Sequence, residues 1–411
     1  MFNLTTIIEF LLAGCTLAAA AFYLLSMIAA YRFFALAPQP DAATRRHGDA
    51  ATRQDDHVEP INLPPVSILI PLHGADFNAY QNYARFCKQD YSRFQLVFGV
   101  REATDSSIPI VERLKRDFPG HDIELVLCPE VMGTNLKFSN LENMLARVRH
   151  EHLIIVDSDI RVEPDYLRRV ITELQREGVG LVTCLYRAAA TADFASRLEA
   201  VGITAEFAAG VLMARMLEGV KFALGSTMAT TRTRLQSIGG FRALKDYLAD
   251  DFMLGNLIAA DGYEVRLSHV VVETLMPPVG FIGMLRHQMR WARSTRISRP
   301  AGYLGLLLTY GTALALINVT VARASWFSLA LLALTLIVRL LMGWLVGVHY
   351  LEDRILKKYF YLVPLRDLLS FVIWAVSWFG RTVEWRGRRF EVKRDGRMVQ
   401  VAGQSILPQA K

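Results

Sequence analysis

The segment Leu153-Ile-Ile-Val-Asp157-Ser-Asp159 is a short apolar run that ends in two aspartates two positions apart. Three similar runs precede it, at 66–71, 95–100 and 123–127, with helix-like segments between them. This alternation predicts an α/β domain with a mostly parallel sheet, whose ligands bind beyond the carboxyl ends of the strands. We therefore expect Asp157 and Asp159 to lie in a ligand site.

The pair of aspartates predicts a metal site. Two carboxylates this close repel each other unless a cation neutralises them, and Mg²⁺ and Mn²⁺ prefer oxygen ligands. A divalent cation on Asp157 and Asp159 would also hold the diphosphate of a sugar nucleotide. Asp105 follows the second apolar run and stands alone, so a solvated loop acid or a helix cap is an equally ordinary interpretation of it.

Asp250 and Asp251 precede apolar residues at helical spacing, Met253, Leu254 and Leu257, so they begin a predicted helix. Acidic residues at such a position also stabilise the helix dipole, and capping is the alternative interpretation. Adjacent carboxylates raise each other's proton affinity, which suits a general base. We predict that Asp251, with Asp250 beside it, takes the proton of an attacking hydroxyl.

Two basic segments complete the predicted site. Lys137 lies in Gly133-Thr-Asn-Leu-Lys-Phe-Ser-Asn140 and can meet a phosphate as a point charge, although a loop and a solvated helix start would also explain it. In His287-Gln-Met-Arg290-Trp291, Arg290 can donate several hydrogen bonds to a diphosphate, and Trp291 can pack against a sugar or uracil. The alternative for this second segment is a basic helix at a lipid surface.

The composition indicates a chain that is part membrane protein and part water-soluble domain. Of 411 residues, 52% are hydrophobic and 21% charged. The net charge of +7 is spread along the chain and concentrates beside the apolar runs, which favours lipid head groups and excludes nucleic acid as a partner. The four cysteines are far apart in sequence, so we predict reduced packing residues without disulfides.

The hydrophobic pattern predicts five regions: a transmembrane anchor at 1–35, a flexible linker at 36–65, a cytosolic catalytic domain at 66–300, membrane helices at 301–380 and a basic cytosolic tail at 381–411. Residues 303–322 carry no charge and are long enough to span, and 324–350 are interrupted only by Arg339. Arg366 and Asp367 shorten the segment 362–379, for which we predict a re-entrant or interfacial course. The positive-inside rule predicts a multi-pass protein of the cell membrane with its catalytic domain on the cytoplasmic side.

The order of these motifs resembles glycosyltransferase family 21, which includes ceramide glucosyltransferases and the bacterial hopanoid-biosynthesis glycosyltransferases. The resemblance covers roughly 66–299 and includes Val66-Ser-Ile-Leu, Asp90-Tyr91 and Asp157-Ser-Asp-Ile-Arg161. It implies a GT-A fold (a nucleotide-diphospho-sugar transferase domain), a UDP-sugar donor, a divalent cation, either Mg²⁺ or Mn²⁺, and inversion at the anomeric carbon.

The resemblance also implies roles for single residues. Asp105 would lie beside the uridine, Asp157 and Asp159 at the metal and diphosphate, and Asp251 would be the general base. Arg290 and Trp291 would belong to a late motif that closes over the diphosphate.

Three departures from the family pattern matter. His287 stands where family members often have Gln or Arg, and many eukaryotic members have Gly at the position of Asp159. The segment 205–213 is small and apolar and lacks the His-Pro-Arg piece associated with ceramide-using animal enzymes. This last difference tilts the expected acceptor toward a hopanoid.

We therefore expect a membrane-bound inverting glycosyltransferase that moves a hexose or N-acetylhexosamine from a UDP-sugar to a lipid hydroxyl in the bilayer. Three alternatives remain open at this point. A processive polysaccharide synthase shares a similar late motif but needs enough membrane helices to line a channel. A phosphatase of the haloacid dehalogenase type also has an apolar strand ending in two aspartates, but that strand opens its fold. A catalytically silent membrane subunit would keep the fold without metal-dependent UDP affinity.

Overall fold

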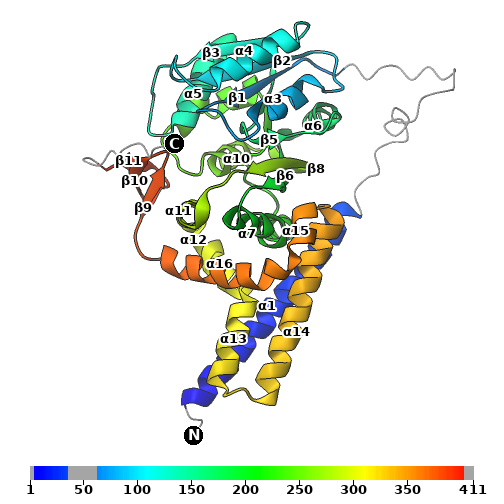
Figure 1. The fold of residues 1–411 in the computed structure, drawn as a ribbon, viewed down its shortest axis with the longest axis vertical. Coiled ribbons are helices and arrows are strands. Elements are labelled where there is room, and N and C mark those ends of the chain that lie inside the picture. The colour runs from blue at the N-terminus through cyan, green and yellow to red at the C-terminus, as the bar shows by residue number, and fades with distance from the viewer. Residues whose placement is uncertain (1–3, 36–62, 402–411) are drawn as a thin grey trace, which may run out of the picture.

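The computed structural model describes residues 4–35 and 63–401, so most of the predicted linker lies outside the described residues. An eight-stranded sheet of order β3-β2-β1-β4-β7-β6-β8-β5 forms the centre of the main domain (Figure 1). Its strands are β1 Val66–Pro71, β2 Phe94–Val100, β3 Asp122–Leu127, β4 His152–Ile155, β5 Ile160–Arg161, β6 Val179–Thr191, β7 Met228–Thr231 and β8 Glu264–Met276.

The sheet is mixed rather than mostly parallel. Strands β1 to β4 run parallel, as the apolar runs predicted, and β6 pairs in parallel with β8. Strand β7 is antiparallel to both of its neighbours, and β5 is antiparallel to β8. The loops after β1, β2 and β4 therefore open at one edge of the sheet, where ligands of α/β sheets bind.

Helices cover both faces of the sheet. Alternate residues of β1 divide between two hydrophobic cores: Ile68 and Ile70 pack in one, Leu69 in the other. The first core is covered by α3 Ala79–Cys87, α4 Ile108–Asp117 and α6 Tyr166–Leu174, and the second by α5 Leu136–Met144, α9 Arg232–Ser237 and α10 Asp250–Ala260. Because α5 and α10 share a face, their first turns come close together.

A helical bundle projects from this domain (Figure 1). The helices α1 Leu4–Phe34, α13 Gly311–Val321 and α14 Trp326–Gly343 pack against one another. A β-carbon at Gly311 would lie 3.0 Å from Ala19 and 2.9 Å from Thr335, so the three backbones approach closely. Phe10, Trp326 and Ile337 stay exposed, which suits contact with lipid.

The remaining helices lie between the bundle and the sheet or follow it. They are α7 Phe194–Gly202, α8 Ala208–Glu218, α11 Gly280–Ser298, α12 Pro300–Gly305, α15 Arg354–Lys358 and α16 Val363–Ser377. A π-helical turn at Ile203–Phe207 joins α7 to α8, and another at Trp344–Tyr350 extends α14.

By length and composition, four helical segments within the described ranges can cross a membrane: Leu4–Phe34, Phe194–Glu218, Trp326–Tyr350 and Phe360–Ser377. The second was not expected, and it is more buried within the protein than the other three. The last, which contains α16, runs crosswise to the bundle (Figure 1), and its predicted re-entrant or interfacial course stays a prediction.

The expected straight span at 303–322 is instead a bent pair, Pro300–Thr309 and Gly311–Val321, with an angle of 59°. Tyr23 stabilises the break, because its hydroxyl donates to the carbonyl of Thr309 (2.7 Å) and accepts from the amide of Gly311 (2.9 Å). A side chain from α1 thus satisfies two backbone groups released by the bend. The break depends on a distant residue, which explains why the local sequence did not predict it.

The charges that interrupt the apolar segments pair with one another. Arg339 of α14 donates to both carboxylate oxygens of Asp367 in α16, at 2.6–3.1 Å, and both side chains are almost fully buried. Thr312 also donates to Asp367 (2.7 Å). In the same way, Arg366 donates to Glu206 (3.3 Å) and Gln288 (2.7 Å).

We expect Arg339→Leu to lower the free energy of unfolding by about 3–5 kcal/mol, because it leaves Asp367 buried without its partner. Replacing both residues by leucine removes the unpaired charge and recovers most of this loss. Thermal and chemical unfolding in detergent, followed by tryptophan fluorescence, measures both effects. A double variant no more stable than the single one would contradict the assignment.

Residues 382–400, predicted only as part of a basic tail, contain a second, three-stranded sheet of order β11-β10-β9. It consists of β9 Thr382–Trp385, β10 Arg388–Val392 and β11 Met398–Gln400. Val383, Phe390 and Met398 form a small core with Leu248, two residues before α10. The sheet is therefore attached to the segment that carries Asp250 and Asp251.

Candidate functional site

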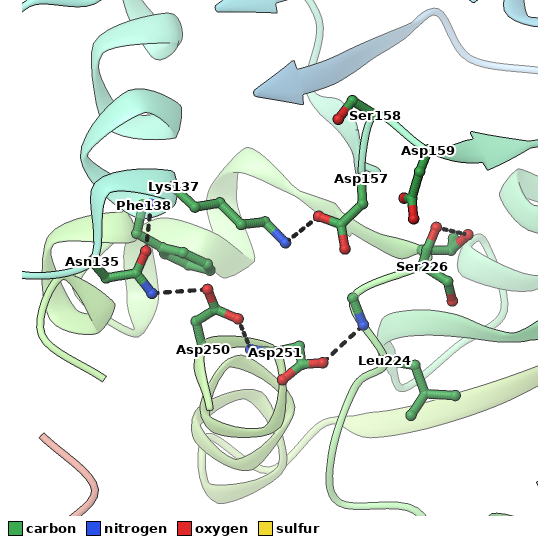
Figure 2. Close-up of polar contacts among 12 residues, drawn as sticks. Asn135, Lys137, Phe138, Asp157, Ser158, Asp159, Leu224, Ser226, Asp250 and Asp251 are labelled. Carbon is green, nitrogen blue, oxygen red and sulfur yellow. Dashed lines mark hydrogen bonds and ion pairs between the residues drawn. The ribbon is translucent and has the colours of Figure 1, made fainter. Parts of the chain in front are cut away.

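The first turns of α5 and α10 and the loop after β4 bring four predicted site residues together (Figure 2). Lys137 of α5 donates to Asp157 Oδ1 (2.5 Å) and is 9% exposed. Burial opposes its charge, but the carboxylates of Asp157, Asp250 and Asp251 raise the pKa of Lys137 above its ordinary value. Lys137 is thus a fixed cation among three acids, an arrangement that the sequence analysis did not predict.

Asp250 has a positioning role. Its side chain is buried and accepts a hydrogen bond from Asn135 Nδ2 (2.8 Å) at the N-cap of α5. Its other oxygen accepts from the backbone amide of Asp251 (2.8 Å). These bonds connect the beginnings of the two helices and hold a negative charge next to Asp251.

Asp251 has the properties of a general base. Its carboxylate accepts from the amides of Gly225 (2.9 Å) and Phe252 (2.7 Å). Burial, then the charge of Asp250, raises the pKa of Asp251 to about 6, although Lys137 opposes the shift. A carboxylate with this pKa is ionised at neutral pH and is a stronger base than an ordinary aspartate.

Gly225 faces the carboxylates of Asp157 and Asp251, and the sequence analysis did not identify this glycine as a site residue. A β-carbon there would lie 3.0 Å from Asp157 Oδ2, 3.4 Å from Asp251 Oδ2 and 3.8 Å from Lys137 Nζ. These three groups therefore surround a space that only a glycine leaves open. The run of small residues Gly225-Ser-Thr227 before β7 was the available signal.

Asp159 is placed differently from Asp157. It accepts a hydrogen bond from Thr274 Oγ1 (2.8 Å), and burial together with the charge of Asp157 raises its pKa to about 7. In Figure 2 its side chain lies beside Asp157, away from Lys137. Asp157 is 40% exposed at the side chain, and its Oδ2 faces the space at Gly225.

The donor atoms fit a divalent cation. Asp157 and Asp159 offer carboxylate oxygens alone, which Mg²⁺ and Mn²⁺ prefer, and Mg²⁺ commonly uses one or two carboxylates together with substrate phosphates. Within residues 4–35 and 63–401, no three His, Cys, Asp or Glu side chains group as a metal-ligand set.

The four cysteines, all within these ranges, are free thiols, as predicted.

Asp105 stabilises the loop after β1 by hydrogen bonds. Its carboxylate accepts from the amides of Gly74 (2.9 Å) and Ser107 (2.9 Å) and from the Ser107 hydroxyl (2.6 Å). Burial opposes ionisation, but these hydrogen bonds hold the pKa of Asp105 below its ordinary value. The same loop contributes Asp76, which accepts a hydrogen bond from Ser158 and which the sequence analysis missed.

The late motif lies on α11. His287 Nδ1 pairs with Glu199 Oε1 (2.6 Å), and the rings of His287 and Trp291 are 4.4 Å apart. Trp291 therefore packs on His287. Burial lowers the pKa of Arg290, while the charges of Asp250 and Asp251 oppose this shift, so Arg290 faces the acidic cluster.

Around Gly225, Lys137 and the acids Asp157, Asp159, Asp250 and Asp251 can orient a hydroxyl and a phosphorylated leaving group.

One nearby cavity of about 220 Å³ is lined by Gly283, Arg286, His287, Arg290, Glu384, Trp385, Arg386 and Gly387. A second, of about 500 Å³, adjoins Arg286 and Arg290 on α11 and strands β9 and β10. Both cavities are rich in arginine, which suits an anionic ligand.

A sequence profile described as glycosyl transferase family 21 matches residues 16–398. Ceramide glucosyltransferase 1 of Caenorhabditis elegans is 27% identical over 207 residues, which are 50% of this chain and 44% of the relative. Ceramide glucosyltransferase 3 of the same organism is 25% identical over 248 residues, 57% of this chain and 51% of the relative. The matched region thus spans about half the length of these curated relatives.

The solved structure of mannosyltransferase PcManGT from Pyrobaculum calidifontis, in complex with GDP-Man and Mn²⁺, superposes with a TM-score of 0.50 at 20% identity. The superposition covers 90% of this chain and 99% of that one. At this identity the similarity concerns the fold alone, and it agrees with the predicted GT-A architecture.

Proposed function

The chain belongs to glycosyltransferase family 21, and we propose that it transfers one hexose or N-acetylhexosamine from a UDP-sugar to the hydroxyl of a membrane lipid. The observation that carries this proposal is the convergence of Asp157, Lys137 and Asp251 around Gly225. A fixed cation and a general base on either side of one small space are what an in-line displacement requires.

In the proposed reaction the acceptor oxygen attacks the anomeric carbon, the bond from that carbon to the diphosphate breaks, and UDP leaves. Asp251 takes the proton of the attacking hydroxyl. Asp250 and Gly225 hold Asp251 in position, and the charge of Lys137 favours its ionised form. Attack opposite to the leaving group inverts the anomeric configuration.

The leaving UDP carries negative charge that the site must stabilise. A divalent cation held by Asp157, with Asp159 beside it, would supply Lewis-acid stabilisation of the diphosphate. Lys137 and Arg290 add fixed positive charge in a largely buried position, where it stabilises an anion more strongly than in water.

The acceptor reaches the site from the bilayer in this proposal. The candidate spans, and the exposed apolar side chains on α1 and α14, support a membrane location, and the basic residues beside them support a cytoplasmic catalytic domain. The names of the curated relatives favour ceramide as acceptor. The apolar segment 205–213 is the feature that favours a hopanoid.

The direct test uses purified protein in vesicles that contain either ceramide or a hydroxylated hopanoid. Each preparation receives UDP-glucose, UDP-N-acetylglucosamine or a GDP-sugar with Mn²⁺, and mass spectrometry identifies the lipids. The proposal predicts a single-sugar product with a UDP-sugar. A ladder of products would indicate a polysaccharide synthase, and transfer from a GDP-sugar alone would reject the UDP-sugar donor.

We expect kcat to be constant near neutral pH and to fall about tenfold per pH unit below about pH 6, because Asp251 must be ionised to accept a proton. Burial and Asp250 raise its pKa, so the loss begins at a higher pH than for an ordinary aspartate. Single-turnover rates measured from pH 4.5 to 8 check this. A decline that begins only near pH 4 would contradict the role given to burial.

A further inference from the structure

The turn between β9 and β10 is unusual in its sequence. Trp385 pairs with Arg388, so the hairpin has a two-residue loop, Arg386-Gly387. Both residues have positive φ, 50° and 71°. Such turns favour Asn-Gly or Asp-Gly, and an arginine in the left-handed region is strained. The hairpin itself does not explain why arginine occupies this position, and strain of this kind is concentrated at functional sites.

The turn is held in a fixed position relative to the acidic cluster. The amide of Leu248 donates to the carbonyl of Gly396 (3.2 Å), and the amide of Met398 donates to the carbonyl of Asp246 (2.7 Å). On the other side, Arg293 of α11 donates to the carbonyl of Thr382. The small sheet is therefore attached both to the segment before Asp250 and to the helix that carries Arg290.

Arg386 lies at the wall of the smaller cavity, together with Arg290 and His287. It is exposed, because this cavity is open to solvent. The guanidinium carbons of Arg290 and Arg386 are each 5.9 Å from the centroid of the Trp385 ring. Two cations gathered around one ring repel each other, and an anion bound between them would offset that repulsion.

Arg386 also faces carboxylates from three separate elements. The charges of Asp157, Asp76 and Asp250 favour the charged form of its guanidinium. These residues come from the loop after β4, the loop after β1 and the start of α10. The guanidinium is therefore within electrostatic range of acids from both loops and from α10.

We propose that Arg386 binds the diphosphate of the sugar nucleotide and that the β9–β10 hairpin is part of the donor site. This inference rests on the proposed function. The planar guanidinium donates paired hydrogen bonds that match phosphate oxygens. Arg386 and Arg290 lie near the same Trp385 ring and line the same cavity, so both can reach one bound diphosphate.

Arg386→Asn tests this proposal without threatening the turn, because asparagine is favoured at this position of such a hairpin. The expected result is a Kd for UDP raised about 10- to 100-fold in the presence of Mn²⁺, the loss expected for hydrogen bonds to a charged group. The affinity for uridine, which has no phosphate, stays unchanged, and the melting temperature does not fall. Isothermal titration calorimetry and thermal unfolding measure these quantities on the full chain.

Arg394→Asn is the matched control, because Arg394 is an exposed arginine in the turn that follows β10. It should bind UDP like the unaltered protein. If Arg386→Asn binds UDP normally or more tightly, Arg386 only balances the carboxylates and the inference fails. If it loses uridine as well, or melts earlier, Arg386 is structural and the inference again fails. If the unaltered protein does not bind UDP, the proposed function itself is wrong.

Discussion

Replacing Asp251 by asparagine is expected to lower turnover at least about a hundredfold, because the variant cannot accept the proton of the attacking hydroxyl. UDP affinity should be retained, since Asp157, Lys137 and Arg290 remain in place. Turnover is measured by product formation in vesicles, and UDP affinity by calorimetry. Near-normal turnover would remove Asp251 from the proposed role.

The stability of this variant separates chemistry from folding. Burial raises the pKa of Asp251 above its unfolded value, so the ionised carboxylate opposes folding at neutral pH. Asparagine carries no charge, and the melting temperature should therefore stay the same or rise. Asp250→Asn is the matched control: it removes the neighbouring charge, lowers the pKa of Asp251 and moves the acidic limb of the pH profile downward. A control that loses all activity would show that Asp250 itself participates in the reaction.

Replacing Asp157 by asparagine is expected to reduce Mn²⁺-dependent UDP affinity about a hundredfold, the upper range for a disturbed metal site. Asparagine keeps the shape of the side chain beside Lys137 but removes the charge that faces Gly225. Calorimetry with UDP, with and without Mn²⁺, isolates the metal-dependent part of the binding free energy.

Asp159→Asn provides the comparison within the same loop. Asp159 already accepts a hydrogen bond from Thr274, whereas Asp157 Oδ2 faces the space at Gly225. The replacement of Asp159 should cost less UDP affinity than the replacement of Asp157. A larger loss for Asp159→Asn would reverse the two roles.

The parts of the fold that follow from local sequence were predictable. Strands β1 to β4 are short apolar runs that differ by at most one residue at either end from their predicted positions. Their parallel order puts Asp105 and Asp157 at one edge of the sheet, and the helical spacing after Asp251 predicted the start of α10.

The features of the fold and the site that depend on contacts between distant residues were not predictable from the sequence. The break at Tyr310 is stabilised by Tyr23 from another helix, and Gly225 matters only because two distant carboxylates approach it. Strands β9 to β11 are short and lie in a segment, 381–400, that is dense in arginine, so its charge concealed the alternation of Val383, Phe390 and Val392 toward a core. Arg386 consequently appeared as one more basic residue of a tail.

The attachment of the small sheet to the segment before α10 has a consequence for biosynthesis. Residues 382–398 follow all the bundle helices in the chain, yet Leu248 completes its packing only against Val383, Phe390 and Met398. During synthesis, from the N-terminus onward, the main domain therefore emerges with this segment uncovered. In the proposal that the β9–β10 hairpin belongs to the donor site, that site is complete only after the bundle helices have been made, so a chain still in synthesis lacks part of it.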